Sequence, residues 1–269
     1  MRTAVTTTPD PPLLLVAHGT RDPAGPVVVE SIAAAVAERA NISVHVAYVD
    51  VIGPTVADAL RALDGPVVAL PAFLASGYHV RTDLPAQIAA AGRTRDVVVS
   101  PPLGPDPELA RAMLDRLTES GWRPGQNVLV SAAGSSDERA LGDVRTAARQ
   151  LGRLCGQRVL PSFVTTAQPL TEDVCANGNV AFIAPNLLAP GLFHRRLTEL
   201  PARAVAEPIG AHSRVLDLIV RRYRAGAPRR RSTDARSSEA TAPARGDGRR
   251  FGDERQEHRK LARQRGMLR

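Results

Sequence analysis

A ten-residue stretch near the start of the chain has a second, altered copy later in the sequence. LLLVAHGTRD, residues 13–22, is an apolar run followed by histidine, glycine and a polar turn. VLVSAAGSSD, residues 128–137, keeps the apolar run, the glycine, a hydroxyl residue and the aspartate, but has Ala133 where the first copy has His18. VIGPTVAD also matches TAQPLTED, and PAFLASGYH matches PNLLAPGLF. The spacing is 115 residues in two pairs and 114 in the third, which indicates duplication of a whole half.

Each half alternates apolar runs of strand length with segments of helical periodicity. This alternation predicts parallel strands joined by right-handed helical crossovers. We therefore predict an α/β fold of two similar lobes, each a four-stranded parallel sheet flanked by helices. The predicted strands are 13–17, 42–49, 66–74, 96–100, 126–131, 158–164, 179–184 and 203–206. The predicted helices are 26–39, 54–63, 82–91 with Thr82 as its cap, 106–120, 136–154, 169–175, 194–200 and 211–224.

The basic character of the chain is concentrated at its C-terminal end. The formal net charge is +8, and residues 227–269 hold twelve Arg and one Lys against six Asp or Glu. The rest is nearly neutral, so the high pI predicts no nucleic-acid surface on the folded part. The tail has no apolar periodicity, which predicts disorder. The expected domains are an N-terminal lobe at 11–122 that carries the active site, a duplicated C-terminal lobe at 123–225 and a disordered basic tail at 226–269.

Composition and short motifs exclude several classes of protein. No run approaches the roughly 18 apolar residues of a membrane-spanning helix, and the first ten residues lack the apolar core of a secretory signal. Cys155 and Cys175 form no CxxC and are interpreted as buried side chains in a reducing cytoplasm. Neither a phosphate-binding glycine motif nor a GxSxG nucleophile motif is present. We predict a cytoplasmic protein without a membrane partner.

Two histidines and an aspartate follow the first three predicted strands. His18 follows the first strand, Asp50 ends the second in AYVD, and His79 follows the third in SGYH. Ligands of parallel α/β sheets bind at the carboxyl ends of the strands, where these three side chains are expected to meet. Imidazole and carboxylate suit a divalent metal such as Fe, Co, Ni or Zn, and imidazole also suits proton transfer near neutral pH. Taken singly, each could equally be a loop residue or a helix cap.

The second half lacks these chemical groups. Its equivalents are Ala133, Thr165 and Phe193, none of which is a good metal ligand, so the chemistry is assigned to the first half. His194 lies one position beyond the equivalent of His79 and is either a partial replacement or a surface histidine.

AHGTRD, AYVD and PAFLASGYHVRTDLP, each after a strand, together resemble the sirohydrochlorin chelatases, which are class II tetrapyrrole chelatases. The resemblance extends over residues 13–224 and includes AAGSSD, LLAPG and AEPIGAH in the second half. It implies metal insertion without ATP or an organic cofactor, with the macrocycle between two pseudo-symmetric lobes and His18 and His79 as the catalytic, metal-binding pair. Asp50 would be a third metal ligand, but it stands where the family often has glutamate.

The resemblance also implies a substrate, sirohydrochlorin, that carries many carboxylates. Arg21, Arg81, Arg195 and Arg196 are candidates to bind them. The residues expected to bind the tetrapyrrole are Gly19, Arg21, Ser76, Gly77, Tyr78, Arg81 and His194. The expected activity is insertion of Fe²⁺ for sirohaem synthesis, by a monomer, and the alternatives are Co²⁺ insertion for cobalamin synthesis and a non-catalytic tetrapyrrole or metal carrier. A plain two-lobed small-molecule binding protein is a further alternative.

Overall fold

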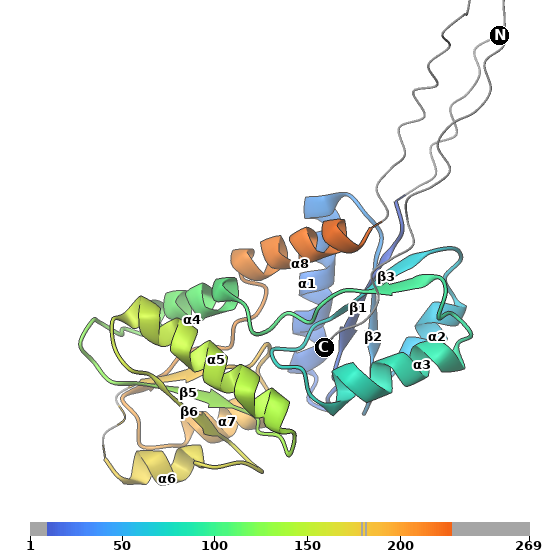
Figure 1. Ribbon diagram of the computed structural model, residues 1–269. Helices are drawn as coiled ribbons and strands as arrows, with labels where there is room; N and C mark the ends of the chain where they lie inside the picture. Colours follow the sequence, from blue (N-terminus) through green and yellow to red (C-terminus); the bar gives the residue numbers. More distant parts are fainter. Residues whose placement is uncertain (1–9, 179, 181, 228–269) are drawn as a thin grey trace, which may run out of the picture. The chain divides into compact units, whose positions relative to one another are not determined.

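The computed structural model describes residues 10–178, 180 and 182–227, and it confirms the two-lobed parallel α/β fold (Figure 1). The tail predicted for the C-terminal end lies outside these residues from position 228 onward. The first half contains β1 (Leu13–Ala17), α1 (Ala24–Ala40), β2 (Val44–Tyr48), α2 (Val56–Arg61), β3 (Val67–Pro71), the π-helical turn η1 (His79–Asp83), α3 (Leu84–Ala90), β4 (Val97–Val99) and α4 (Pro107–Glu119). The second half contains β5 (Val128–Ala132), α5 (Glu138–Cys155), β6 (Leu160–Phe163), α6 (Thr171–Ala176), β7 (Phe182–Pro185), α7 (Leu192–Thr198), β8 (Ala204–Val205) and α8 (Ser213–Gly226).

Both sheets are parallel and have the same strand order. The first is β2-β1-β3-β4 and the second is β6-β5-β7-β8, so the first strand of each half lies inside its sheet. All five residues of β1, LLLVA, are buried, because helices cover both faces of the sheet. Leu14 and Val16 pack with residues of α2 and α3, whereas Leu13 and Leu15 pack on the opposite face with residues of α1 and α8.

The fourth helix of each half packs on the lobe of the other half. α4 contacts α5 and β7 of the second half, and α8 contacts α1 and β3 of the first (Figure 1). The largest apolar core consequently contains side chains of α1, α4, α5 and α8 in one cluster. The predicted lobes at 11–122 and 123–225 are each continuous in sequence. In space, α4 packs on elements of the second half and α8 on elements of the first. The described residues of the two halves form one compact unit.

The duplicated segment after the first strand forms the same turn in each half. The Asp22 N–H donates to Thr20 Oγ1, and Asp22 Oδ1 accepts the Ala24 N–H. The Asp137 N–H donates to Ser135 Oγ, and Asp137 Oδ1 accepts the Arg139 N–H at the start of α5. Each aspartate thus satisfies an amide in the first turn of a helix, which explains its retention in both copies.

The lengths of the helices and the surroundings of the two cysteines can be read from the structure. Across the described residues, no helix combines the length and apolar character needed to cross a bilayer. Cys155 and Cys175 are both buried and free. Burial raises the pKa of the Cys155 thiol to about 11, so at neutral pH the side chain is a small apolar group.

Candidate active site

The residues predicted to form the site follow three adjacent strands. His18 comes directly after β1, Asp50 lies two residues after β2, and Phe73 to His79 continue from β3. Because β1 lies between β2 and β3, the carboxyl ends of these strands are neighbours. The fold therefore brings the three segments to one edge of the first sheet.

The two imidazoles lie against each other at this edge. The ring centroids of His18 and His79 are 4.6 Å apart and the rings are nearly perpendicular, at 85°. Phe73 lies 6.4 Å from both rings, and its plane is 29° from that of His79. His18 is exposed and His79 is half-buried, so a ligand can reach the pair from solvent.

Hydrogen bonds define which nitrogen of each imidazole is available. Nδ1 of His18 lies 2.9 Å from the Gly19 carbonyl oxygen, and Nδ1 of His79 lies 2.5 Å from Asp83 Oδ2. Both partners accept hydrogen bonds, so each Nδ1 carries the proton. In the neutral form of each ring the lone pair is then on Nε2, which is the arrangement of metal-binding histidines held by a second group.

Asp83 is the member of this arrangement that sequence reasoning missed. The helix predicted to begin near Thr82 begins instead at His79 as the π-helical turn η1, in which the Leu84 N–H donates to the His79 carbonyl. Because the segment is helical from His79 onward, the side chains of His79 and Asp83, four residues apart, lie on the same face and touch. The His-x-x-x-Asp spacing is the only sequence signal of the pair, and it is informative only if the segment is known to be helical.

Replacing Asp83 with alanine is expected to lower Co²⁺ affinity about 10- to 100-fold, because His79 loses the group that orients its ring. Isothermal titration of Co²⁺ into the protein measures the affinity. Asp64→Ala, at an exposed aspartate, is the control. Equal affinities for Asp83→Ala and the control would contradict an orienting role.

The carboxylate of Asp50 makes a local hydrogen bond, and its role as a third metal ligand stays a prediction. Its Oδ1 accepts the Val51 N–H at 2.7 Å, and the side chain is exposed. Among the described residues, no three His, Cys, Asp or Glu side chains lie together as a metal cage. Asp50 contributes through its backbone instead, because its N–H donates to the His18 carbonyl at 3.0 Å. Of the three predicted metal ligands, the structure brings the His18 and His79 rings into direct contact.

Gly19 has a structural reason to be glycine. Its φ is +95°, and a Cβ at this position would overlap the Asp50 carbonyl oxygen. Gly134 in the second half has φ +107° and the same relation to the Thr165 carbonyl. The glycine is present in both halves although only one half has the histidine, so it serves the turn between adjacent strand ends.

Two of the arginines expected to bind substrate carboxylates are already paired. Arg81 forms an ion pair with Asp137, and Arg195 forms one with Asp22. The hydrogen bond from Arg195, together with the Ala24 N–H, holds the pKa of Asp22 below its usual value. Arg21 and Arg196 are exposed.

The remaining predicted substrate contacts separate into two groups. Ser76, Gly77 and Tyr78 precede η1 beside His79, and Tyr78 is 60% exposed. His194 is buried, and its Nε2 lies 3.2 Å from the Ala206 carbonyl. His194 is therefore not a surface histidine, because it lies on the face of α7 that packs toward β8. Its contact with the substrate stays a prediction.

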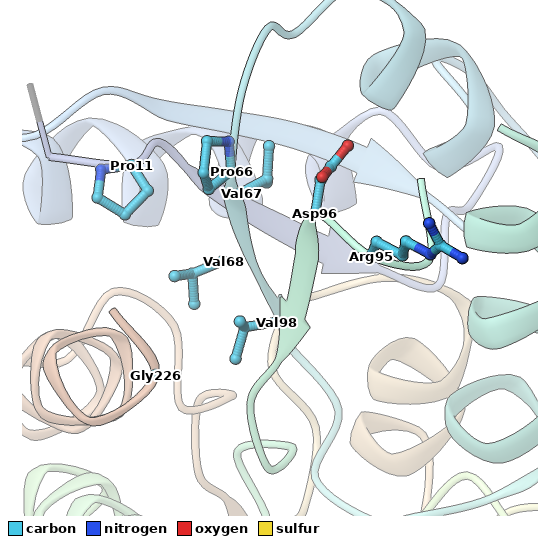
Figure 2. A pocket seen from close by; sticks show the side chains of 8 residues that line it. All are labelled: Pro11, Pro66, Val67, Val68, Arg95, Asp96, Val98 and Gly226. Carbon is cyan, nitrogen blue, oxygen red and sulfur yellow. The ribbon is translucent and has the colours of Figure 1, made fainter. Parts of the chain in front are cut away.

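A separate hollow lies at the opposite end of the first sheet (Figure 2). It is lined mainly by apolar residues before or at the start of the strands, among them Pro11, Pro66 and Val98. Because these are the amino ends of the strands, the hollow is distinct from the histidine site.

The fold and the site define a class: a two-lobed α/β protein with a pair of metal-competent histidines on one lobe. Residues 12–120 and 127–225 each match the family model described as CbiX. The chain therefore belongs to the CbiX family.

Relatives and solved structures agree with this assignment. The sirohydrochlorin cobaltochelatase of Methanopyrus kandleri is 30% identical over 136 residues, covering 40% of this chain and 95% of that protein. The sirohydrochlorin cobaltochelatase of Methanococcoides burtonii is 31% identical over 123 residues, covering 40% of this chain and 94% of its own. Both relatives correspond in size to a single half, as expected for a duplicated chain.

The similarity to solved structures extends over both halves. SirB from Bacillus subtilis with Fe³⁺ has a TM-score of 0.69 at 21% identity, covering 81% of this chain and 96% of that chain. The structure of CbiX described as the terminal enzyme for siroheme biosynthesis in denitrifying bacteria has a TM-score of 0.62 at 25% identity, covering 79% of this chain and 98% of its own.

Proposed function

We propose that this protein is a sirohydrochlorin chelatase that inserts Fe²⁺ into the macrocycle without ATP or an organic cofactor. The observation that carries the proposal is the pair of neighbouring imidazoles, each with Nδ1 bonded to an acceptor. The family assignment and the cobaltochelatase relatives support the substrate class. The structures related by fold include SirB with Fe³⁺ and SirB with cobalt, which suits a metal as the second substrate.

Metal insertion exchanges two pyrrole N–H protons for a divalent ion. Neutral His18 and His79 can hold the incoming metal through Nε2 and can accept protons as the metal moves to the pyrrole nitrogens. Asp83 keeps the proton of His79 on Nδ1 and stabilises the imidazolium once Nε2 is protonated. The exposed Tyr78 ring offers an apolar surface for the macrocycle, and Arg21 and Arg196 offer charge for its carboxylates. We assign this activity to a monomer, because both lobes are present in one chain. The cytoplasmic location stays a prediction from the sequence.

Co²⁺ is the alternative metal, favoured by the cobaltochelatase relatives. Imidazole nitrogen accepts both ions, so a direct comparison is needed. The experiment mixes the purified full chain with sirohydrochlorin and either Fe²⁺ or Co²⁺ without oxygen and follows the loss of the metal-free absorption spectrum. We expect a faster rate with Fe²⁺. A faster rate with Co²⁺ would establish the cobalt alternative, and rates equal to the protein-free reaction with both metals would overturn both.

A further inference from the structure

A carboxylate of the second half holds the backbone of the segment that carries His79. The Ser76 N–H, three residues before His79, donates to Oδ2 of Asp143 on α5 at 2.8 Å. Both residues are partly buried, which shields this charge-assisted hydrogen bond from water. Gly77 also faces α5, because a Cβ there would lie 3.7 Å from the Ala140 Cβ.

A second contact joins the same helix to the segment beyond His79. Arg81 pairs with Asp137, the N-cap residue of α5. The first turns of α5 therefore touch the chain on both sides of the histidine, although α5 belongs to the half without a histidine site.

Comparison of the two halves distinguishes the ion pair from the hydrogen bond. The Arg81–Asp137 pair has a counterpart in Arg195–Asp22, and the arginines and aspartates occupy equivalent positions, 114 and 115 residues apart. A contact made twice in exchanged roles is typical of a two-fold interface, so these ion pairs belong to the joining of the two halves.

The hydrogen bond from Ser76 to Asp143 has no such counterpart. The equivalent of Ser76 is Pro190, which has no N–H, and the equivalent of Asp143 is Val28, which has no acceptor. The segment that carries Phe193 in place of His79 therefore lacks the donor at Pro190, and the first-half helix α1 opposite it lacks the acceptor at Val28. The hydrogen bond is found only beside His79, whereas the arginine–aspartate ion pair is found in both halves.

We propose that Asp143 is a positioning residue for His79, and this inference rests on the proposed function. By holding the Ser76 amide it fixes the start of the segment that places the His79 ring beside His18. Displacement of a reacting group by about 1 Å can cost a hundredfold in rate, so a contact that fixes the backbone matters even though it never touches the metal.

Replacement of Asp143 tests this role through metal binding without the tetrapyrrole. Isothermal titration of Co²⁺ into Asp143→Ala is expected to show about 10-fold weaker binding, in the range found when a supporting group is lost. Asp143→Asn should recover part of the affinity, because its amide oxygen can still accept the Ser76 N–H. Glu138→Gln, on the same helix and with 78% of its side chain exposed, should bind Co²⁺ like the wild type.

The ¹H and ¹⁵N shifts of the Ser76 amide report the hydrogen bond itself and should move in Asp143→Ala but stay in Glu138→Gln. Wild-type Co²⁺ affinity in Asp143→Ala, combined with weakened binding in His79→Ala, would overturn the positioning role and leave the proposed function intact. If Asp143→Ala fails to fold, unchanged Co²⁺ affinity in Asp143→Asn would overturn it equally, provided that the Ser76 amide shifts show the hydrogen bond to be lost in that variant. Co²⁺ affinity unchanged in His79→Ala would contradict the proposed function instead.

Discussion

Replacing either His18 or His79 with alanine is expected to lower the rate of metal insertion about 10²-fold or more. Each imidazole is assigned two tasks, holding the metal through Nε2 and accepting a pyrrole proton, and loss of proton transfer alone costs this much. The rings are 4.6 Å apart, so removal of one also leaves the metal with a single imidazole. Initial rates at saturating tetrapyrrole measure the effect.

His45→Ala is the matched control, because it removes an exposed imidazole from β2, the edge strand of the same sheet. Its insertion rate should equal that of the wild type. Retention of full activity by both His18→Ala and His79→Ala would contradict the assignment. The same variants test the carrier alternative, since a carrier would bind sirohydrochlorin with wild-type affinity and show no insertion rate to lose.

Gly19→Ala is expected to lower the free energy of unfolding by about 3 kcal/mol. Two effects combine: φ of +95° is unfavourable for alanine, and the new Cβ would overlap the Asp50 carbonyl. The turn must shift to relieve the overlap, and His18 is the adjacent residue, so activity should fall as well. Urea unfolding measures the first effect, and the insertion assay measures the second.

Two other glycines separate these contributions. Gly134→Ala meets the Thr165 carbonyl in the second half, so it should be about as destabilising and should disturb no histidine. Gly121→Ala has φ +94° with no atom within 4 Å of the new Cβ, so it isolates the backbone cost of about 1 kcal/mol. Equal unfolding energies for Gly19→Ala and Gly121→Ala would contradict the proposed overlap.

The position of the histidine pair could be predicted because it depends on a general property of parallel sheets. His18 and His79 follow strands that are adjacent in the sheet, and the strands could be located from their apolar runs. The carboxylate could not be placed by the same argument. Asp50 is at the predicted edge, but its side chain bonds to the Val51 N–H, and local hydrogen bonds of this kind are invisible to strand periodicity.

Other features depend on geometry that spacing does not reveal. The contact between His79 and Asp83 needs the segment from His79 to be helical, and the predicted helix began only at Thr82. The packing of α4 and α8 on the opposite lobes could not be predicted either. The sequence shows that each helix has an apolar face, but it does not show which of the two sheets that face covers. The pairing of Arg81 and Arg195 with aspartates follows from how the two halves meet, which the repeat alone does not specify.

Comparison of the two halves nevertheless distinguishes residues of the scaffold from residues of the site, and the structure adds contacts to that comparison. Features shared by both halves, such as Gly19 with Gly134 and the two ion pairs, belong to the scaffold. Features present once, such as His18, His79 and the hydrogen bond from Ser76 to Asp143, belong to the site of the first half.

The most direct test of the account is the initial rate of sirohydrochlorin metallation by the full chain, with Fe²⁺ and with Co²⁺, compared with the His18→Ala/His79→Ala double variant and the protein-free reaction. We predict rapid insertion of at least one metal by the wild type and a rate for the double variant close to that without protein. Metallation by the double variant at the wild-type rate would contradict the claim that the paired histidines perform the chemistry.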